Sequence, residues 1–78
     1  MKTIDQVLGE LRQVAGEIEL KIHLGTSDLK QEWSQLKAKL DYFAAQAQLE
    51  KSGKNLGEAL AILGSELKDA FDRVRRAL

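Results

Sequence analysis

The sequence contains no cysteine and no proline among its 78 residues. Without cysteine, disulfides, thiolate metal sites and thiol catalysis are all excluded. Without proline, the residue that interrupts helices most strongly is missing. Only four aromatic residues are present, so aliphatic side chains must supply most of the core. Such a composition favours helices that pack through leucine, isoleucine, valine and alanine.

Neither sign of charge prevails, because twelve Lys and Arg balance twelve Asp and Glu. A neutral chain has no overall field to attract nucleic acid, so nucleic-acid binding is not expected. Long apolar runs are also missing: the longest spans residues 59–63, whereas a membrane span needs about 20 residues. The first residues turn polar at once and lack the apolar stretch of a signal peptide, which predicts a cytoplasmic protein.

Hydrophobic residues make up 44% and charged residues 31% of the chain, a balance typical of folded proteins. At this length the sequence predicts a single domain over residues 1–78. So short a chain buries only about two-thirds of the surface of its unfolded state. Efficient helix packing or a partner must therefore add stability.

Apolar residues recur at steps of three and four, the spacing of one face of an α-helix. Three such stripes follow one another and predict helices over residues of about 4–24, 29–51 and 56–78. Three helices of similar length with short loops predict an all-α helical bundle. The predicted core includes Trp33, Leu36, Leu40, Leu60, Leu67 and Phe71.

Start and stop signals agree with this division. Thr3, Asp28 and Asn55 each lie three residues before a Gln or Glu, the arrangement of a capping box at a helix start. Gly25 and Gly53 are able to take the left-handed conformation that ends many helices. We therefore expect the chain to leave the helical path near these two glycines.

The break at residues 25–28 has an alternative. The apolar stripe keeps its phase across this segment with one added step of four, which a continuous helix can absorb. Residues 4–51 would then form one rod roughly 70 Å long, and the chain would be a helical hairpin that dimerises antiparallel. Four poor helix formers in a row, Gly-Thr-Ser-Asp, favour the break.

Residues 17–24 have an alternative of their own. Apolar and polar residues alternate there between two glycines, a pattern typical of a strand, with the apolar positions at Ile18, Leu20, Ile22 and Leu24. No other segment alternates in this way, so such a strand would have to pair with its copy in a dimer. The three-and-four stripe through Ile18 and Ile22 favours a helix.

Several apolar residues fall on the helix sides opposite the predicted core. In so short a chain, this surplus predicts a contact between chains. We expect a homo-oligomer, preferably a dimer, or another protein partner, with contacts through Leu20, Leu24, Tyr42, Ala45 and Leu49. The predicted function is that of a non-catalytic helical scaffold or interaction module. The alternative is an amphipathic protein that binds a membrane surface through the same faces.

Residues suited to catalysis or metal binding are few. His23 is the single histidine and lies one helical turn after Glu19, but two ligands do not make a metal site unless a symmetric dimer doubles them. Glu66, Asp69 and Asp72 are interleaved with basic residues, which is typical of a salt-bridged surface rather than of catalytic carboxylates. We expect no enzyme, no cofactor and no metal, with a metal-dependent enzyme as the remaining alternative.

One stretch resembles a known group of proteins. Residues Ile22-His23-Leu24-Gly25, Lys30-Gln31-Glu32-Trp33 and Leu36 are similar to a segment of small, uncharacterised bacterial helical proteins. In that group a His-Leu pair and a Lys-x-Glu-Trp motif join two helical stretches, often through a more helix-friendly segment than residues 25–28. The resemblance covers about half of the chain and implies a bacterial cytoplasmic protein. It carries over no functional residue.

Overall fold

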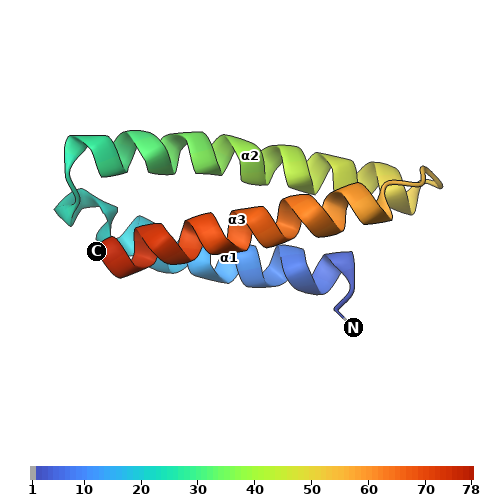
Figure 1. Cartoon of the computed structure of the whole chain (residues 1–78), viewed down its shortest axis with the longest axis horizontal. Coiled ribbons are helices and arrows are strands. Elements are labelled where there is room, and N and C mark those ends of the chain that lie inside the picture. Colours follow the sequence, from blue (N-terminus) through green and yellow to red (C-terminus); the bar gives the residue numbers. More distant parts are fainter. Residues whose placement is uncertain (1) are drawn as a thin grey trace.

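The computed structural model describes residues 2–78 and contains three long helices. They are α1 (Ile4–Lys21), α2 (Ser27–Lys51) and α3 (Gly57–Ala77), with the short 3-10 helix η1 (Ile22–Leu24) directly after α1. Each long helix runs antiparallel to the one before it, and together they form a bundle of 41 × 21 × 17 Å (Figure 1). The predicted all-α three-helix bundle is confirmed.

The start of α1 is the predicted capping box. Thr3 Oγ1 accepts a hydrogen bond from the Gln6 backbone N–H at 3.1 Å, and Gln6 Oε1 accepts one from the Thr3 N–H at 2.9 Å. The two bonds satisfy amides that the first helical turn leaves unpaired. Residues 17–24 continue as helix, first in α1 and then in η1, so the alternative of a strand is wrong.

Gly25 ends this helical stretch in a different way from the one predicted. Its φ is −82°, an extended conformation open to any residue, so a left-handed stop is wrong at this position. Space explains the glycine instead. A Cβ there would lie 3.0 Å from Leu29 Cδ2 and 3.2 Å from the Ile22 carbonyl oxygen. The chain thus turns tightly between α1 and α2.

Thr26, and not Asp28, caps α2. Thr26 Oγ1 accepts a hydrogen bond from the Leu29 N–H at 3.1 Å, and the helix begins at Ser27. Asp28 lies inside the first turn, where its carboxylate complements the positive end of the helix dipole. The break between α1 and α2 also shows that the alternative of one continuous rod over residues 4–51 is wrong. Because the chain folds back here, its helices cover one another's apolar stripes.

The turn between α2 and α3 contains the left-handed residue. Gly53 has a φ of 106°, as its predicted role requires. The predicted capping box at Asn55 is wrong: the N-cap of α3 is Leu56, which makes no side-chain capping bond. Leu56 packs against the core, so burial of an apolar side chain positions this helix start.

In the described part of the chain, twelve apolar side chains form the core, and all six predicted core residues are among them. Trp33 of α2 and Phe71 of α3 pack edge to face, with ring centroids 5.0 Å apart and planes at 69°. In residues 2–78 no polar or charged residue is buried. The described interior therefore holds no ionisable side chain, and any binding must take place on the surface.

Candidate interaction surface

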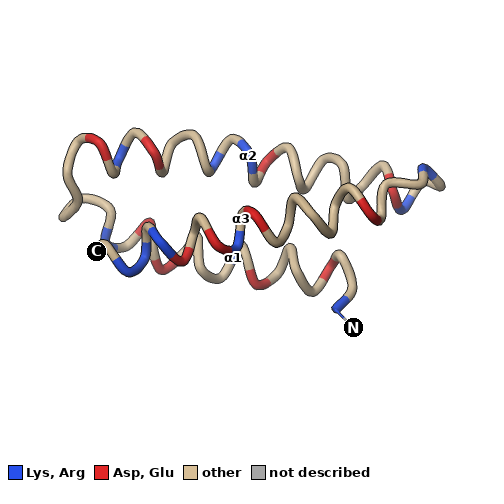
Figure 2. The backbone as a smooth tube through the Cα atoms, in the orientation of Figure 1, with Lys and Arg blue, Asp and Glu red and all other residues tan. Residues whose placement is uncertain are grey.

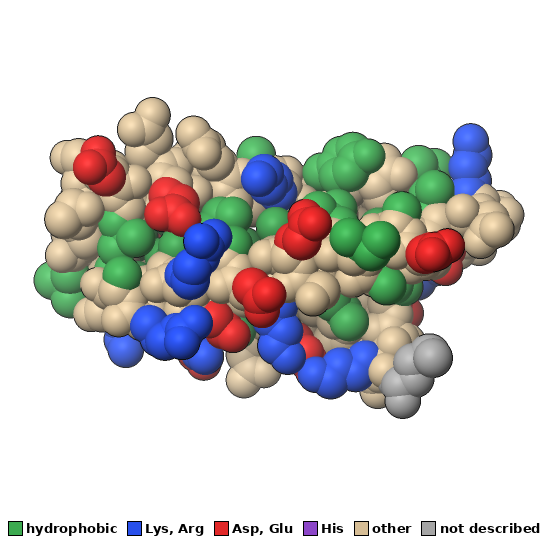
Figure 3. Space-filling view, in the orientation of Figure 1, with side chains coloured by type: hydrophobic (Ala, Val, Ile, Leu, Met, Phe, Trp, Pro, Cys, Tyr) green, Lys and Arg blue, Asp and Glu red, His purple; other side chains and the backbone are tan. Residues whose placement is uncertain are grey.

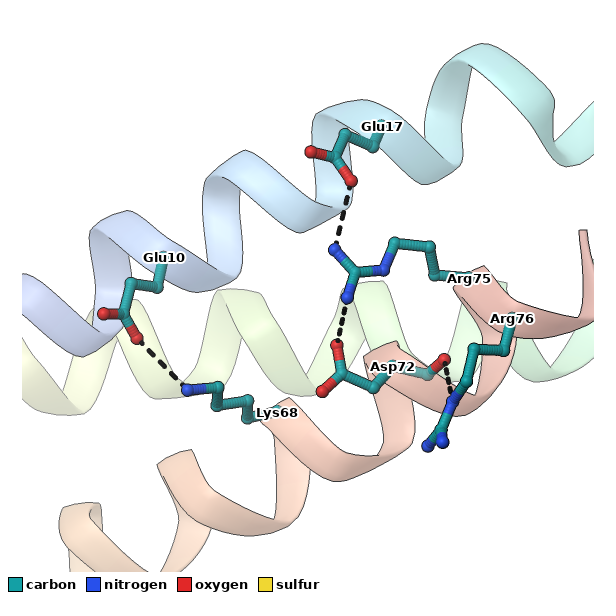
Figure 4. A network of polar contacts seen from close by, with 6 residues as sticks. All are labelled: Glu10, Glu17, Lys68, Asp72, Arg75 and Arg76. Atoms are coloured by element: carbon teal, nitrogen blue, oxygen red, sulfur yellow. Dashed lines mark hydrogen bonds and ion pairs between the residues drawn. The ribbon is translucent and has the colours of Figure 1, made fainter.

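The groove between α1 and α3 contains the densest set of polar contacts (Figure 4). Lys68 Nζ lies 3.6 Å from Glu10 Oε2, and Arg75 pairs with Glu17 at 3.3 Å and with Asp72 at 3.1 Å. Two open pockets of about 270 and 220 Å³ lie along this groove. Because the charged groups that line it already pair with one another, the groove is a weak candidate for a ligand site.

The sequence's one candidate metal pair, Glu19 and His23, is not assembled into a larger cluster. Glu19 Oε1 instead accepts a hydrogen bond from the indole Nε1 of Trp33 at 3.0 Å and lies 3.1 Å from Lys37 Nζ. Lys37 first, and then Trp33, hold the pKa of the Glu19 carboxyl below its ordinary value, because both stabilise its charged form. Within residues 2–78, no three His, Asp or Glu side chains are placed to hold a metal ion.

Among residues 2–78, five large apolar side chains stand exposed on the bundle. The exposed fractions are 77% for Leu20, 71% for Leu24, 58% for Tyr42, 58% for Ile62 and 42% for Leu49. Four of these belong to the predicted contact set, and its fifth member, Ala45, is exposed as well. Sequence reasoning did not include Ile62 in that set, although its position two residues after Leu60 turns it away from the core.

The structure does not bring the predicted contact residues onto one surface. Leu20 and Leu24 lie at the end of α1 and in η1, beside the turn into α2. Tyr42 lies fifteen residues along α2 from Ser27, which corresponds to about 20 Å of helix. Leu20 and Leu24 therefore form one exposed pair, and Tyr42, Ala45 and Leu49 belong to another region.

The second region includes part of α3. Gly57 lies opposite Glu50, and Gly64 lies against the ring of Phe43, which defines the antiparallel register of α2 and α3. In this register Ile62 is level with Ala45, between the levels of Tyr42 and Leu49. Residues far apart in the sequence therefore come to the same level of the bundle.

Tyr42 and Leu49 lie on the outward side of α2, turned toward α3 rather than toward α1. Around this helix Lys51 pairs with Asp5 of α1, Glu50 lies against Gly57 of α3, and Leu49 comes next in the same rotation. Figure 3 shows hydrophobic side chains of α2 and α3 gathered on this face, over the half of the bundle nearer their connecting turn. We call Tyr42, Leu49 and Ile62 the α2–α3 apolar patch.

Two further findings bear on the surface. No helix in residues 2–78 combines the length and the apolar character that crossing a membrane requires. Comparisons of the chain with models of known families, with curated proteins and with solved structures find no match. The resemblance based on residues 22–36 stays a prediction.

Proposed function

We propose that this protein is a non-catalytic helical interaction module of the cytoplasm that self-associates through the α2–α3 apolar patch. One observation carries the proposal: Tyr42, Leu49 and Ile62 take no part in the buried core, and the register of α2 and α3 brings them to neighbouring levels of the bundle. Exposed apolar residues that cluster are typical of contact surfaces, whereas singly scattered ones need no explanation.

The chemistry of the patch suits a protein partner. Tyr42 offers a large apolar ring with a hydroxyl that can stay hydrated, and such side chains are enriched at interfaces. Covering Ile62 and Leu49 removes apolar surface from water, which is the main favourable contribution to association. In a chain of 78 residues, a second copy is the simplest source of a matching surface and adds stability that the small core lacks.

Sedimentation equilibrium and thermal melts over a wide range of protein concentration test the proposal. We expect the average mass to rise above that of the monomer with concentration, and the Tm to rise in parallel, because association stabilises the folded state by mass action. Replacement of Tyr42 and Ile62 by serine should weaken association without loss of helicity. A monomeric mass and a constant Tm at every concentration would contradict the proposal.

The matched control is the replacement of Leu20 and Leu24 by serine. These residues are the most exposed large apolar residues in the described chain, and they lie outside the patch. The control lowers surface hydrophobicity by a similar amount at a different place. We expect this control variant to leave the association constant unchanged, which would distinguish a specific interface from non-specific hydrophobic association.

Leu20 and Leu24 favour a second candidate function, contact with a lipid surface. They protrude at one end of the bundle beside Lys21, whose charge suits an anionic headgroup. Flotation with phosphatidylserine-containing vesicles tests this candidate. Binding that is lost in the Leu20→Ser and Leu24→Ser variant supports it, and absence of the protein from the vesicle fraction contradicts it.

A further inference from the structure

The outer side of α3 carries a second regular stripe, separate from its buried one. Its members are all exposed and recur at steps of four and three: Ile62, Glu66, Asp69, Arg73 and Arg76. Along this stripe the residue types follow a simple order, one apolar residue, then two acidic and then two basic. Basic residues gather toward the C-terminal end of α3 (Figure 2).

The charges of this stripe differ from those at the α1-facing edge of the same helix. Lys68 and Arg75 of that edge reach carboxylates of α1, at 3.6 and 3.3 Å. Within residues 2–78, by contrast, Glu66, Asp69 and Arg73 take part in no ion pair. Arg76 donates only its Nε, to the backbone oxygen of Asp72 at 3.3 Å. The four charged residues of the outer stripe therefore have no ion-pair partner in the described fold.

We infer that a second copy of the chain packs antiparallel against this stripe, about a two-fold axis that passes between Asp69 and Arg73. This inference rests on the proposed function, because it specifies how self-association takes place. Antiparallel packing puts Asp69 opposite the partner's Arg73, and Glu66 opposite the partner's Arg76. The two-fold axis repeats both pairs, so four ion pairs form across one α3–α3 contact.

The order of charges selects this register against the obvious alternatives. Parallel packing would place Glu66 opposite the partner's Glu66 and Arg73 opposite the partner's Arg73. An antiparallel contact centred on Ile62 would bring Glu66 level with the partner's Glu58. Like charges at an interface are unfavourable, so both alternatives are disfavoured while the register between Asp69 and Arg73 is favoured.

Ile62 and Tyr42 of the apolar patch lie near the two ends of this contact, whereas Leu49, level with Glu58, lies beyond it. In the inferred register the partner's Ala77, which is exposed, lies within about one helical turn of Ile62. Tyr42 stands at almost the same level of the bundle as Ile62, because the register of α2 and α3 places Tyr42 between the levels of Gly64 and Glu66. The interface thus has a charged centre and apolar ends. Contacts of this kind are salt-sensitive, since surface ion pairs are screened by added ions.

Two charge-reversed variants test the arrangement. One carries Glu66→Lys with Asp69→Lys, and the other carries Arg73→Glu with Arg76→Glu. In each variant alone, like charges meet across the two-fold axis, so we expect the dimer dissociation constant to rise at least tenfold. An equimolar mixture restores opposite charges at all four positions, and we expect a heterodimer by native mass spectrometry.

The control changes net charge by the same amount as the second variant, but away from α3. Arg12→Glu with Lys30→Glu alters two exposed residues of α1 and α2, and we expect wild-type association. Dimers of unchanged strength in both charge-reversed variants, or a mixture that stays monomeric, would overturn the arrangement. If wild type dimerises and only the Tyr42 and Ile62 variant weakens it, the proposed function stands and this arrangement falls. A wild-type monomer at every concentration overturns both.

Discussion

The two sides of α3 are held by different kinds of contact. Toward α2 the contact is aromatic: Phe71 meets Trp33 edge to face, and Phe43 lies against Gly64. Toward α1 the helix presents the same small residue, Gly64, together with the charged groups Lys68 and Arg75. Large rings bury much apolar surface, whereas a glycine permits close approach and ion pairs at the edge add little free energy.

This difference has a consequence for stability. We expect the α2 side to be most sensitive to truncation of its large rings, and the α1 side, which buries Leu11 and Ile18, to be most sensitive to added volume at Gly64. A Cβ on Gly64 would lie 2.9 Å from Val7 Cγ1 and 3.2 Å from Phe43 Cε2. Four substitutions test this contrast between the two sides.

The largest effect is expected for Phe71→Ala. Phe71 is fully buried, so its truncation removes apolar contacts and leaves a cavity that should lower the free energy of unfolding by ~3–5 kcal/mol. Urea unfolding followed by circular dichroism measures the change. The exposed Leu20→Ala, outside the α2–α3 apolar patch, serves as control and should stay within about 0.5 kcal/mol of wild type. A similar loss in both variants would contradict the packing described.

Gly64→Ala should destabilise the bundle by ~1–3 kcal/mol, because the added methyl overpacks the contact between α1 and α3. The matched control is Gly16→Ala. A Cβ at Gly16 meets no atom within 4 Å, so the gain in helix propensity should raise stability by ~0.5–1 kcal/mol. Changes of opposite sign in the free energy of unfolding for these two Gly→Ala substitutions would show that the helices approach closely at Gly64. A stabilising Gly64→Ala would show that α1 and α3 are more loosely packed.

A smaller effect is expected for Arg75→Met. This change removes the ion pairs of Arg75 with Glu17 and Asp72 and keeps much of the aliphatic stem. Exposed pairs of this kind contribute ~0.2–1 kcal/mol each. The loss should shrink further at high salt, since the ions screen the charges. Thermal melts at low and high salt measure this loss of stability. A loss that does not depend on salt would point to packing by the aliphatic stem of Arg75 instead.

The smallest effect concerns pH. The ammonium of Lys2 first, with Lys68 as a further cause, holds the pKa of the Glu10 carboxyl below its ordinary value of 4.5. A lowered pKa in the folded state stabilises the fold above pH 4.5. This contribution is lost as the pH falls through the lower, folded-state pKa. Urea unfolding between pH 3 and pH 7 should therefore show a shallower loss in Glu10→Gln than in wild type. Equal slopes would contradict the shift.

Much of the fold was accessible from local signals. The steps of three and four predicted all three helices and their buried sides, because an amphipathic helix has to cover one stripe wherever it packs. The capping box at Thr3 and the left-handed Gly53 were also predicted, since both depend only on neighbouring backbone groups. These features need no knowledge of the rest of the chain.

The errors occurred where several local solutions compete. Thr26 and Asp28 are both good caps, and only the tight turn at Gly25 makes Thr26 the residue that stands before the first helical turn. Asn55 is a better cap than Leu56 in isolation, yet burial of Leu56 against the core moved the start of α3. In both places tertiary packing outweighed a local preference.

The candidate interaction surface also depends partly on local sequence and partly on tertiary packing. The sequence alone determined which residues cannot reach the core, because their angular positions on each helix oppose the buried stripe. Only the tertiary structure decided which of them meet: the register between α2 and α3 joins Ile62 to Tyr42 and Leu49 and leaves Leu20 and Leu24 at the other end. Periodicity orients a side chain about its own helix axis, but the distance between two helices depends on how the whole chain packs.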